Sequence, residues 1–199
     1  MFPERVETDR LRLERLTQDH LFEVYEHVKR GAPDIEAITE YVSWSPHRSL
    51  GETREFIAES TKRWNDGEGA TYVLRPAAGE PHEGELGGTT GFGIDWDRRT
   101  AELGLWLRKP LWGRGYSGER AGAFMDLVFT QLDLDLVVVS HLPDNERSER
   151  AIEKYIERHG GRREGLLRNN LVRQDGAVVD EVRYSVSQAE YHEAVEERS

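Results

Sequence analysis

The apolar positions near the middle of the chain recur first at every second residue and then at helical spacing. Over residues 101–107, Leu103, Leu105 and Leu107 share one face and Glu102, Gly104 and Trp106 share the other, which predicts a strand. Pro110 ends this pattern, because proline lacks the amide hydrogen that a strand or helix interior needs. After a turn with glycines, a helix is predicted by the spacing of Ala121, Phe124, Met125, Val128 and Leu132.

The same two periods predict the elements on either side of this centre. Strands are expected over 10–13, 72–74, 87–95, 133–141, 163–172 and 178–187, and helices over 19–30, 49–64 and 146–159. In the helix over 49–64 the positions that favour helical packing are Thr53, Phe56, Ile57 and Trp64. From about residue 188 the chain is acidic and is expected to fray. With no linker or repeat, the sequence predicts one mixed α/β domain over residues 1–199.

The glycine turn between the central strand and helix is the first candidate for chemistry. Gly113, Gly115 and Gly118 let backbone N–H groups converge on a phosphate at a helix start, where the helix dipole also favours negative charge. Their spacing also matches the dinucleotide fingerprint GxGxxG, but residues 108–112 separate the strand from the first glycine. Asp133 and Asp135 also precede the next apolar run instead of ending it. A nucleotide-dependent oxidoreductase therefore stays only an alternative.

Three motifs carry a resemblance to a known family. They are AELGLWL at 101–107, WGRGYSGE at 112–119, and Asn145 followed by Ser148 in NERS; ETDRLRL at 7–13 extends the likeness upstream. In this order they resemble the GNAT superfamily of acetyl-CoA-dependent N-acetyltransferases, in particular its ribosomal-protein N-terminal (RimJ/RimL-like) branch. The resemblance implies a GNAT fold, with a mixed, mostly antiparallel sheet of about seven strands flanked by about four helices.

The resemblance also implies which residues bind acetyl-CoA. The glycine turn would hold the diphosphate, and the backbone of the central strand would pair with the pantetheine arm and polarise the acyl carbonyl. The implied cofactor-binding residues are Leu105, Trp106, Leu107, Trp112, Gly113, Arg114, Gly115, Tyr116, Ser117, Gly118, Asn145 and Ser148. The expected reaction is direct attack by an amine in a ternary complex, which agrees with the absence of cysteine.

Three residues are candidates for proton transfer. Glu102, on the central strand, could deprotonate the amine, or could be one more solvated glutamate. Ser148, from the NxxS motif, could protonate the thiolate, or could only satisfy a backbone amide at the helix start. Ser148 is preferred over Tyr155, whose phenol lies seven residues further along the chain and is the alternative proton donor. His141, at a strand end, is expected to be structural. Trp44 and His47, in the turn-rich segment 31–50, could border the acceptor pocket or cover the core.

Composition narrows the choice of partners. A net charge of −11 argues against a nucleic-acid surface, and no apolar run approaches membrane-spanning length. Zero cysteines are compatible with a cytoplasmic protein, and no metal-ligand spacing is present. The many acidic residues and only four lysines favour a halophilic protein over a protein whose surface is merely acidic.

The sequence thus predicts a cytoplasmic N-acetyltransferase that uses acetyl-CoA. Its acceptor is an amine, either a protein N-terminal α-amine or a small amine. The alternatives are a non-catalytic acyl-CoA-binding or sensor module and, less favoured, the oxidoreductase. A homodimer is left open.

Overall fold

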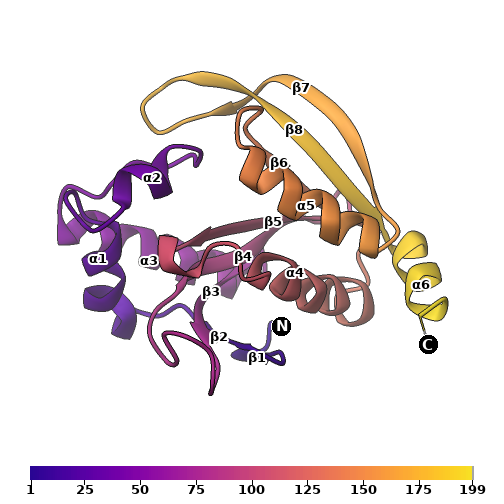
Figure 1. Cartoon of the computed structure of the whole chain (residues 1–199), viewed down its shortest axis with the longest axis horizontal. Helices are drawn as coiled ribbons and strands as arrows, with labels where there is room; N and C mark the ends of the chain where they lie inside the picture. Colours follow the sequence, from indigo (N-terminus) through magenta and orange to yellow (C-terminus); the bar gives the residue numbers. More distant parts are fainter. Residues whose placement is uncertain (199) are drawn as a thin grey trace. The chain divides into compact units, whose positions relative to one another are not determined.

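The computed structural model describes residues 1–198, which form eight strands and six α-helices (Figure 1). The strands are β1 (Arg5–Glu7), β2 (Leu11–Arg15), β3 (Gly69–Pro76), β4 (Gly88–Asp95), β5 (Thr100–Leu107), β6 (Leu136–His141), β7 (Arg162–Val172) and β8 (Val178–Ser187). The helices are α1 (Leu21–Val28), α2 (Ile35–Thr39), α3 (Leu50–Asp66), α4 (Tyr116–Asp126), α5 (Glu146–Arg158) and α6 (Gln188–Glu196). Short turns η1 (Gln18–His20) and η2 (Lys109–Leu111) precede α1 and α4, and the π-helical η3 (Leu127–Gln131) follows α4.

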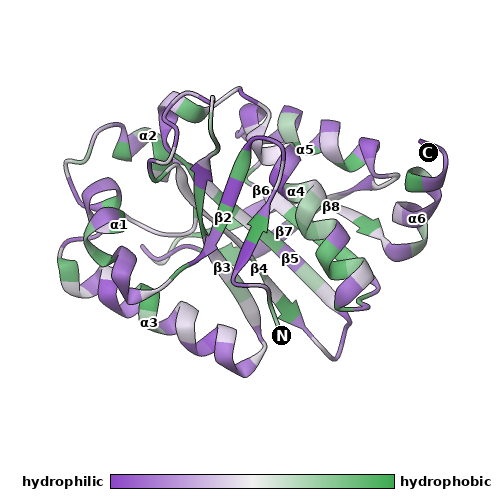
Figure 2. Cartoon of the chain, turned by 90° about the horizontal axis from the view of Figure 1, so that it is seen from below, coloured by the Kyte–Doolittle hydropathy of each residue, from purple (hydrophilic) through white to green (hydrophobic). Residues whose placement is uncertain are grey.

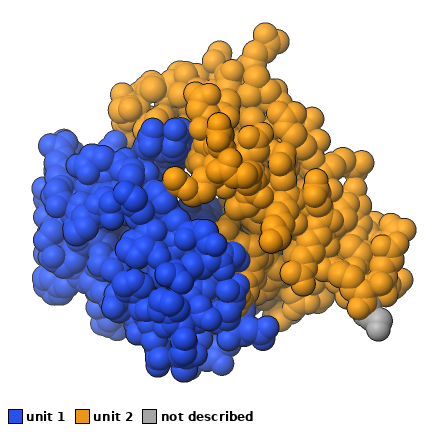
Figure 3. Space-filling model, viewed as in Figure 1, with its two compact units in different colours: residues 1–93, 104–116 blue, residues 94–103, 117–199 orange. Residues whose placement is uncertain are grey.

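The chain forms two compact units, each made of two segments (Figure 3). Unit 1 holds residues 1–93 and 104–116, and unit 2 holds residues 94–103 and 117–199. In unit 1 the strands follow the order β1-β2-β3-β4-β5, and in unit 2 the order β5-β6-β8-β7. Antiparallel pairing predominates, and β5 with β6 is a parallel pair. This confirms the expected mixed sheet, with slightly more elements than predicted.

The core of unit 1 forms where α1 and α3 pack on the sheet. Ser49 caps α3 by accepting a hydrogen bond from the Glu52 amide, and Gly67, in the left-handed region at φ +74°, ends the helix. The buried cluster on this side consists of Leu16, Val24, Val28, Ile38, Ile57, Val73, Leu86 and Trp106. Trp44 packs edge-on against Trp106, with 5.8 Å between the ring centroids. Trp44 therefore makes the contacts of a core residue.

In unit 2 the helix α5 covers β6, β7 and β8. Its polar and apolar residues alternate around the helix (Figure 2), and Ile152, Tyr155 and Ile156 are buried. β7 and β8 form a long hairpin (Figure 1), closed by a turn at Gly176. These contacts hold α5 on the three strands of unit 2.

Five observations differ from what the sequence suggested. Phe56 lies on the exposed side of α3, and Trp106 is buried although it shares a strand face with Glu102 and Gly104. The segment 31–50 contains a short helix, α2. β1 precedes the first expected strand. Residues from 188 form α6, because Ser187 and Glu190 make a capping box and Tyr191 is buried.

Among residues 1–198, no helix is both long and apolar enough to cross a bilayer.

Candidate functional site

The glycine loop between η2 and α4 has the backbone conformation that its sequence predicts. Gly113 and Gly115 lie at φ +76° and +81°, a region that side chains disfavour, and both are exposed. A Cβ built on Gly113 would meet no atom within 4 Å. The loop thus presents accessible backbone amides directly before the start of α4.

Two side chains of the loop bond back to the segment that precedes it. The Trp112 indole Nε1 donates to the Leu107 carbonyl at 2.9 Å, and the Arg114 Nε donates to the Pro110 carbonyl at 3.1 Å. The loop is therefore fixed to the end of β5. Arg114 is exposed and adds a guanidinium to the loop.

Arg10, which directly precedes β2, contacts this loop and was missed by sequence reasoning. Its Nη1 donates to the Arg114 carbonyl at 3.0 Å, and its guanidinium carbon lies 5.2 Å from the centre of the Tyr116 ring. Its Nη2 would be 3.4 Å from a Cβ on Gly115. No spacing rule links residues 104 positions apart. The only available signal was the basic residue inside the ETDRLRL motif.

Glu80 contacts the loop at its C-terminal end, at Tyr116. The Tyr116 hydroxyl donates to Glu80 Oε2 at 2.5 Å. Burial, together with this hydrogen bond, raises the pKa of Tyr116 to about 12, so the hydroxyl stays protonated and can donate at neutral pH. With two cations and two glycines at positive φ, the donor set of the loop fits a phosphate-type anion.

In β5, the residues of unit 2 and unit 1 differ in exposure. Glu102 is exposed and is the last residue that pairs with β6, opposite Val138. Leu105 is half-buried, and Trp106 and Leu107 are buried. In unit 1 the Thr90 hydroxyl of β4 donates to the Gly104 carbonyl at 2.9 Å, which ties this part of β5 to β4.

The start of α5 is capped as the NxxS motif suggests. The Asn145 side chain accepts a hydrogen bond from the Ser148 amide at 3.1 Å. Asn145 therefore satisfies a free amide of the first turn, which is the structural interpretation of this residue. Ser148 is half-buried and presents its hydroxyl one turn into the helix.

Tyr155 lies two turns further along α5 and is 3% exposed. Its hydroxyl has no hydrogen-bond partner among the described residues, and the same holds for Nε and Nη1 of Arg120 in α4. Arg120 is 2% exposed, which is unusual for an arginine. Sequence reasoning did not identify Arg120, because an arginine within an amphipathic pattern is normally assigned to the solvent side.

The two histidines considered as alternatives have structural roles. In unit 2, His141 stacks on Tyr184, with 5.6 Å between centroids, and its Nδ1 contacts the Leu142 carbonyl at 2.8 Å. In unit 1, His47 is buried with its Nδ1 2.7 Å from the Thr53 hydroxyl. Burial lowers the pKa of His47, so the ring is neutral at pH 7.

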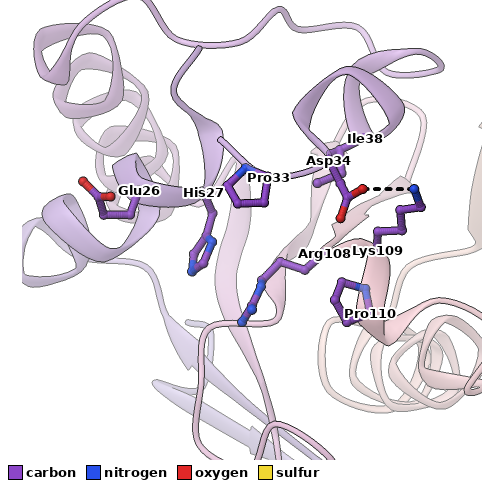
Figure 4. Close-up of a pocket in the computed structure, with 8 residues that line it drawn as sticks. All are labelled: Glu26, His27, Pro33, Asp34, Ile38, Arg108, Lys109 and Pro110. Atoms are coloured by element: carbon purple, nitrogen blue, oxygen red, sulfur yellow. Dashed lines mark hydrogen bonds and ion pairs between the residues drawn. The ribbon is translucent and has the colours of Figure 1, made fainter. Parts of the chain in front are cut away.

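A cavity of about 260 Å³ opens in unit 1 beside the end of β5 (Figure 4). Its lining consists of Glu26, His27, Pro33, Asp34, Ile38, Arg108, Lys109 and Pro110. Asp34 and Lys109 form an ion pair at 3.0 Å, and Arg108 pairs with Glu85 at 2.8 Å. The Glu26 carboxylate points away from the other lining residues (Figure 4). The lining is thus of mixed charge, and it gives no preference for cationic ligands.

The predicted site residues fall into two groups, one in each unit. Unit 1 contains Leu105, Trp106, Leu107, Trp112, Gly113, Arg114, Gly115 and Tyr116. Unit 2 contains Glu102, Ser117, Gly118, Asn145, Ser148 and Tyr155. The candidate anion-binding residues therefore belong mainly to unit 1, and the candidate proton-transfer groups belong to unit 2.

Comparison with known proteins identifies this arrangement. Residues 10–155 match the acetyltransferase (GNAT) domain, which is more than half of the chain. The matched domain is that of an N-acetyltransferase, and enzymes of this family use acetyl-CoA. The chain belongs to the GNAT acetyltransferase family. This membership favours the transferase over both the sensor module and the oxidoreductase.

Three relatives illustrate the similarity. An uncharacterized N-acetyltransferase p20 of Bacillus licheniformis is 25% identical over 155 residues, which is 77% of this chain and 82% of that protein. The structure of RimL, a ribosomal L7/L12 alpha-N-protein acetyltransferase, has a TM-score of 0.75 at 18% identity, with 92% and 94% of the two chains covered. A spermidine N-acetyltransferase from Vibrio cholerae, solved with CoA and spermine, has a TM-score of 0.71 at 20% identity, with 93% and 99% covered.

Proposed function

We propose that this enzyme transfers the acetyl group of acetyl-CoA to the α-amine of a protein N terminus, in the manner of the ribosomal-protein acetyltransferases. The observation that carries the cofactor part of this proposal is the glycine loop, held open between Arg10 and Glu80 with Gly113 and Gly115 at positive φ. Support for the α-amine is the set of motifs shared with the ribosomal-protein branch.

The residues with the binding role in this proposal come mostly from unit 1. The amides of residues 113–118 bind the diphosphate, and Arg10 and Arg114 add positive charge. The backbone of Leu105 to Leu107 pairs with the pantetheine arm, and one of its N–H groups polarises the acyl carbonyl. Acetyl-CoA, when bound, supplies an acyl group activated as a thioester. Asn145 contacts the pantetheine while it caps α5.

The residues of unit 2 have the proton-transfer role. Glu102 accepts the proton of the incoming amine, directly or through a water molecule. The departing sulfur needs a proton donor, for which Ser148 and Tyr155 are the candidates. The Tyr155 hydroxyl has no hydrogen-bond partner among the described residues, and this supports Tyr155 as the donor.

The cavity next to β5 is the candidate acceptor site. Pro33, Asp34 and Ile38 belong to the segment that borders the acceptor pocket in related enzymes, and Arg108 follows β5 directly. Ile38→Trp would fill part of this cavity. It should raise the KM for the acceptor and leave the affinity for acetyl-CoA unchanged.

An acceptor screen tests the proposal. Peptides with free and with blocked N termini, spermidine, amino acids and an aminoglycoside are compared by release of free thiol from acetyl-CoA. A free N-terminal peptide is expected to be the best acceptor, and a preference for spermidine would refute the α-amine assignment. Arg10→Met should weaken acetyl-CoA binding several-fold in calorimetry, while Arg5→Met, which removes an exposed arginine of β1, serves as the control.

A second candidate function, acetylation of a polyamine, is favoured by one observation. A spermidine N-acetyltransferase solved with CoA and spermine has the same fold. The unit 1 cavity, in which Asp34 pairs with Lys109, does not by itself favour a cationic acceptor. The screen decides between the two.

A further inference from the structure

A turn in the loop between β3 and β4 contacts both the residue before β2 and the first residue of α4. The Ala77 amide donates to the Arg10 carbonyl at 2.8 Å, and the Glu80 amide closes the turn on the Ala77 carbonyl at 3.1 Å. Gly79, at φ +85°, occupies the third position of this turn, where glycine is favoured. The Glu80 carboxylate accepts the Tyr116 hydroxyl at 2.5 Å. The turn therefore fixes Arg10 by its backbone and Tyr116 by its side chain.

The ring of Tyr116 supports the guanidinium of Arg10. The tyrosine is 1% exposed, and the guanidinium carbon lies 5.2 Å from the ring centre, within the range of cation–π attraction. Arg10 Nη1 also donates to the Arg114 carbonyl at 3.0 Å. Its Nη2 is 3.4 Å from the place that a Cβ on Gly115 would occupy. A buried ring thus holds the guanidinium beside the glycine loop, and Glu80 holds the ring.

The three glutamates of the loop between β3 and β4 have different partners. Glu83 is exposed and accepts a hydrogen bond from a backbone amide of the turn at 3.0 Å, and the exposed Glu85 pairs with Arg108 at 2.8 Å. Glu80 is half-buried and bonds to Tyr116. Glu80 is therefore the acidic side chain of this loop that acts on the start of α4.

The charge of Glu80 opposes the binding of an anion at the glycine loop. Burial and Glu80 raise the pKa of Tyr116, and Arg114 and Arg10 lower it, so all three charges act on the same hydroxyl. Because like charges repel, a carboxylate among these guanidinium groups weakens their attraction for a phosphate. The hydrogen bond to Tyr116 gives Glu80 a role that can offset this repulsion.

We propose that Glu80 and Tyr116 are positioning residues for Arg10, whose guanidinium binds a phosphate group of CoA beside the glycine loop. This inference rests on the proposed binding of acetyl-CoA at that loop. A guanidinium donates paired hydrogen bonds to a phosphate when its plane has the correct orientation. The buried ring fixes this plane before the ligand arrives, so less conformational freedom is lost on binding.

The first test measures the Kd for CoA by calorimetry. Arg10→Met is expected to raise the Kd about five-fold, and Glu80→Ala about three-fold, although the second change removes a charge that repels the ligand. Glu80→Gln keeps an oxygen that accepts the Tyr116 hydroxyl, so it should bind CoA at least as tightly as the wild type. Glu55→Ala removes an exposed carboxylate of α3 and is the matched control for charge, with a Kd like that of the wild type.

Double variants separate positioning from a general effect on the loop. Tyr116→Phe removes the hydroxyl and keeps the ring, and it should raise the Kd as much as Glu80→Ala does. The combination of the two should lose no more than either alone, because both break the same hydrogen bond. In the Arg10→Met background, Glu80→Ala should not weaken binding further. At saturating acetyl-CoA, kcat should stay within about two-fold in all these variants, since only uniform binding is lost.

The phosphate that Arg10 contacts is identified with dephospho-CoA, which has the diphosphate and lacks the phosphate on the ribose. A loss of affinity in Arg10→Met that persists with this ligand assigns Arg10 to the diphosphate. A loss that is present with CoA and disappears with dephospho-CoA assigns it to the ribose phosphate. Both results uphold a contact between Arg10 and a phosphate.

A second readout uses the protein without ligand. The NMR signal of the Arg10 Nε–H group, identified by its absence in Arg10→Met, is shifted by the ring current of Tyr116. Glu80→Ala should move this signal toward that of an exposed arginine, and Glu80→Gln should leave it in place. Thermal unfolding checks that each variant is folded.

Three results would overturn the inference. They are a Kd in Glu80→Ala that is unchanged or lower, an equal loss from Glu80→Ala in the Arg10→Met background, or an unmoved Arg10 signal. A wild-type protein that does not bind CoA would refute the cofactor part of the proposed function instead. The NMR measurement without ligand would still decide whether Glu80 positions Arg10.

Discussion

Gly118 of α4 lies against Tyr155 of α5, so closely that a Cβ on the glycine would be 3.4 Å from the tyrosine Cβ. The backbone of one helix thus determines where the phenol of the other stands. The close packing of α4 on α5 therefore explains a glycine at residue 118, whether or not this residue also contacts a phosphate.

Substitution of Gly118 should therefore affect catalysis in proportion to size. Gly118→Ala adds an ordinary contact and should retain most activity. Gly118→Leu overpacks the helix interface and should cost about 1–3 kcal/mol of the free energy of unfolding. It should also lower kcat, because α5 and Tyr155 must shift. Equal kcat values for the alanine and leucine variants, measured with Tm for both, would contradict this view.

Gly115→Glu should abolish acetyl-CoA binding, since its side chain and charge would both oppose the diphosphate. The substitution also places a side chain at φ +81°, which costs stability by itself. Gly176→Glu is the matched control, because Gly176 has φ +86° and open space around it, in the hairpin of β7 and β8. Calorimetry should find no binding for the first variant and normal binding for the second.

Glu102→Gln should lower turnover and spare the affinity for acetyl-CoA, because it removes the base and no cofactor contact. Ser148→Ala should have the smaller effect on kcat if Tyr155 is the proton donor, whereas Tyr155→Phe should lower it by about 10²-fold. The measurements are kcat at saturating substrates and the Kd for CoA. A Ser148→Ala variant with the larger loss would assign the proton to Ser148.

Stability below pH 5 should depend on an ion pair between β3 and α1 of unit 1. Arg75 donates two hydrogen bonds to Glu23, at 2.7 and 2.6 Å, and a third to Glu14 at 3.0 Å. The hydrogen bond from Arg75 lowers the pKa of Glu23, although partial burial opposes this. A carboxyl whose pKa is lowered by folding stabilises the protein at pH values above its pKa in the unfolded chain, about 4.3. This stabilisation disappears as the pH falls through the pKa of the folded protein.

The Tm of the wild type should thus decrease between about pH 5 and pH 3, and Glu23→Gln should make the decrease shallower. At pH 7 Glu23→Gln should lower the free energy of unfolding by about 1 kcal/mol, a modest value because the glutamate is partly exposed. Glu26→Gln is the control, since its exposed pair with Lys29 contributes little. A pH profile for Glu23→Gln that matches the wild type would contradict the prediction.

The sequence predicted the central elements well because their signals are local. The alternation over 101–107 and the glycines at 113 and 115 gave β5 and the loop before α4 almost to the residue. α6 was missed, because its acidic residues suggested a frayed tail and the capping box of Ser187 and Glu190 was not recognised.

Contacts between distant residues could not be predicted in this way. Arg10 contacts Arg114 across 104 positions, and Glu80 contacts Tyr116 across 36. The burial of Arg120 contradicts the usual preference of arginine, so only the packed helices reveal it. A homodimer, a cytoplasmic location and adaptation to high salt stay predictions.

The division of the chain has a practical consequence for engineering. The chain passes from one compact unit to the other after Gly93, after Leu103 and after Tyr116, so neither unit is a single uninterrupted stretch. The glycine loop, α1 and the cavity all belong to unit 1, but they lie on two separate segments of the chain. Unit 1 therefore cannot be replaced by that of another transferase through a single fusion point. A change of acceptor must therefore be made by substitutions within the intact chain, since a chimera would need three junctions, two of them at β4 and β5.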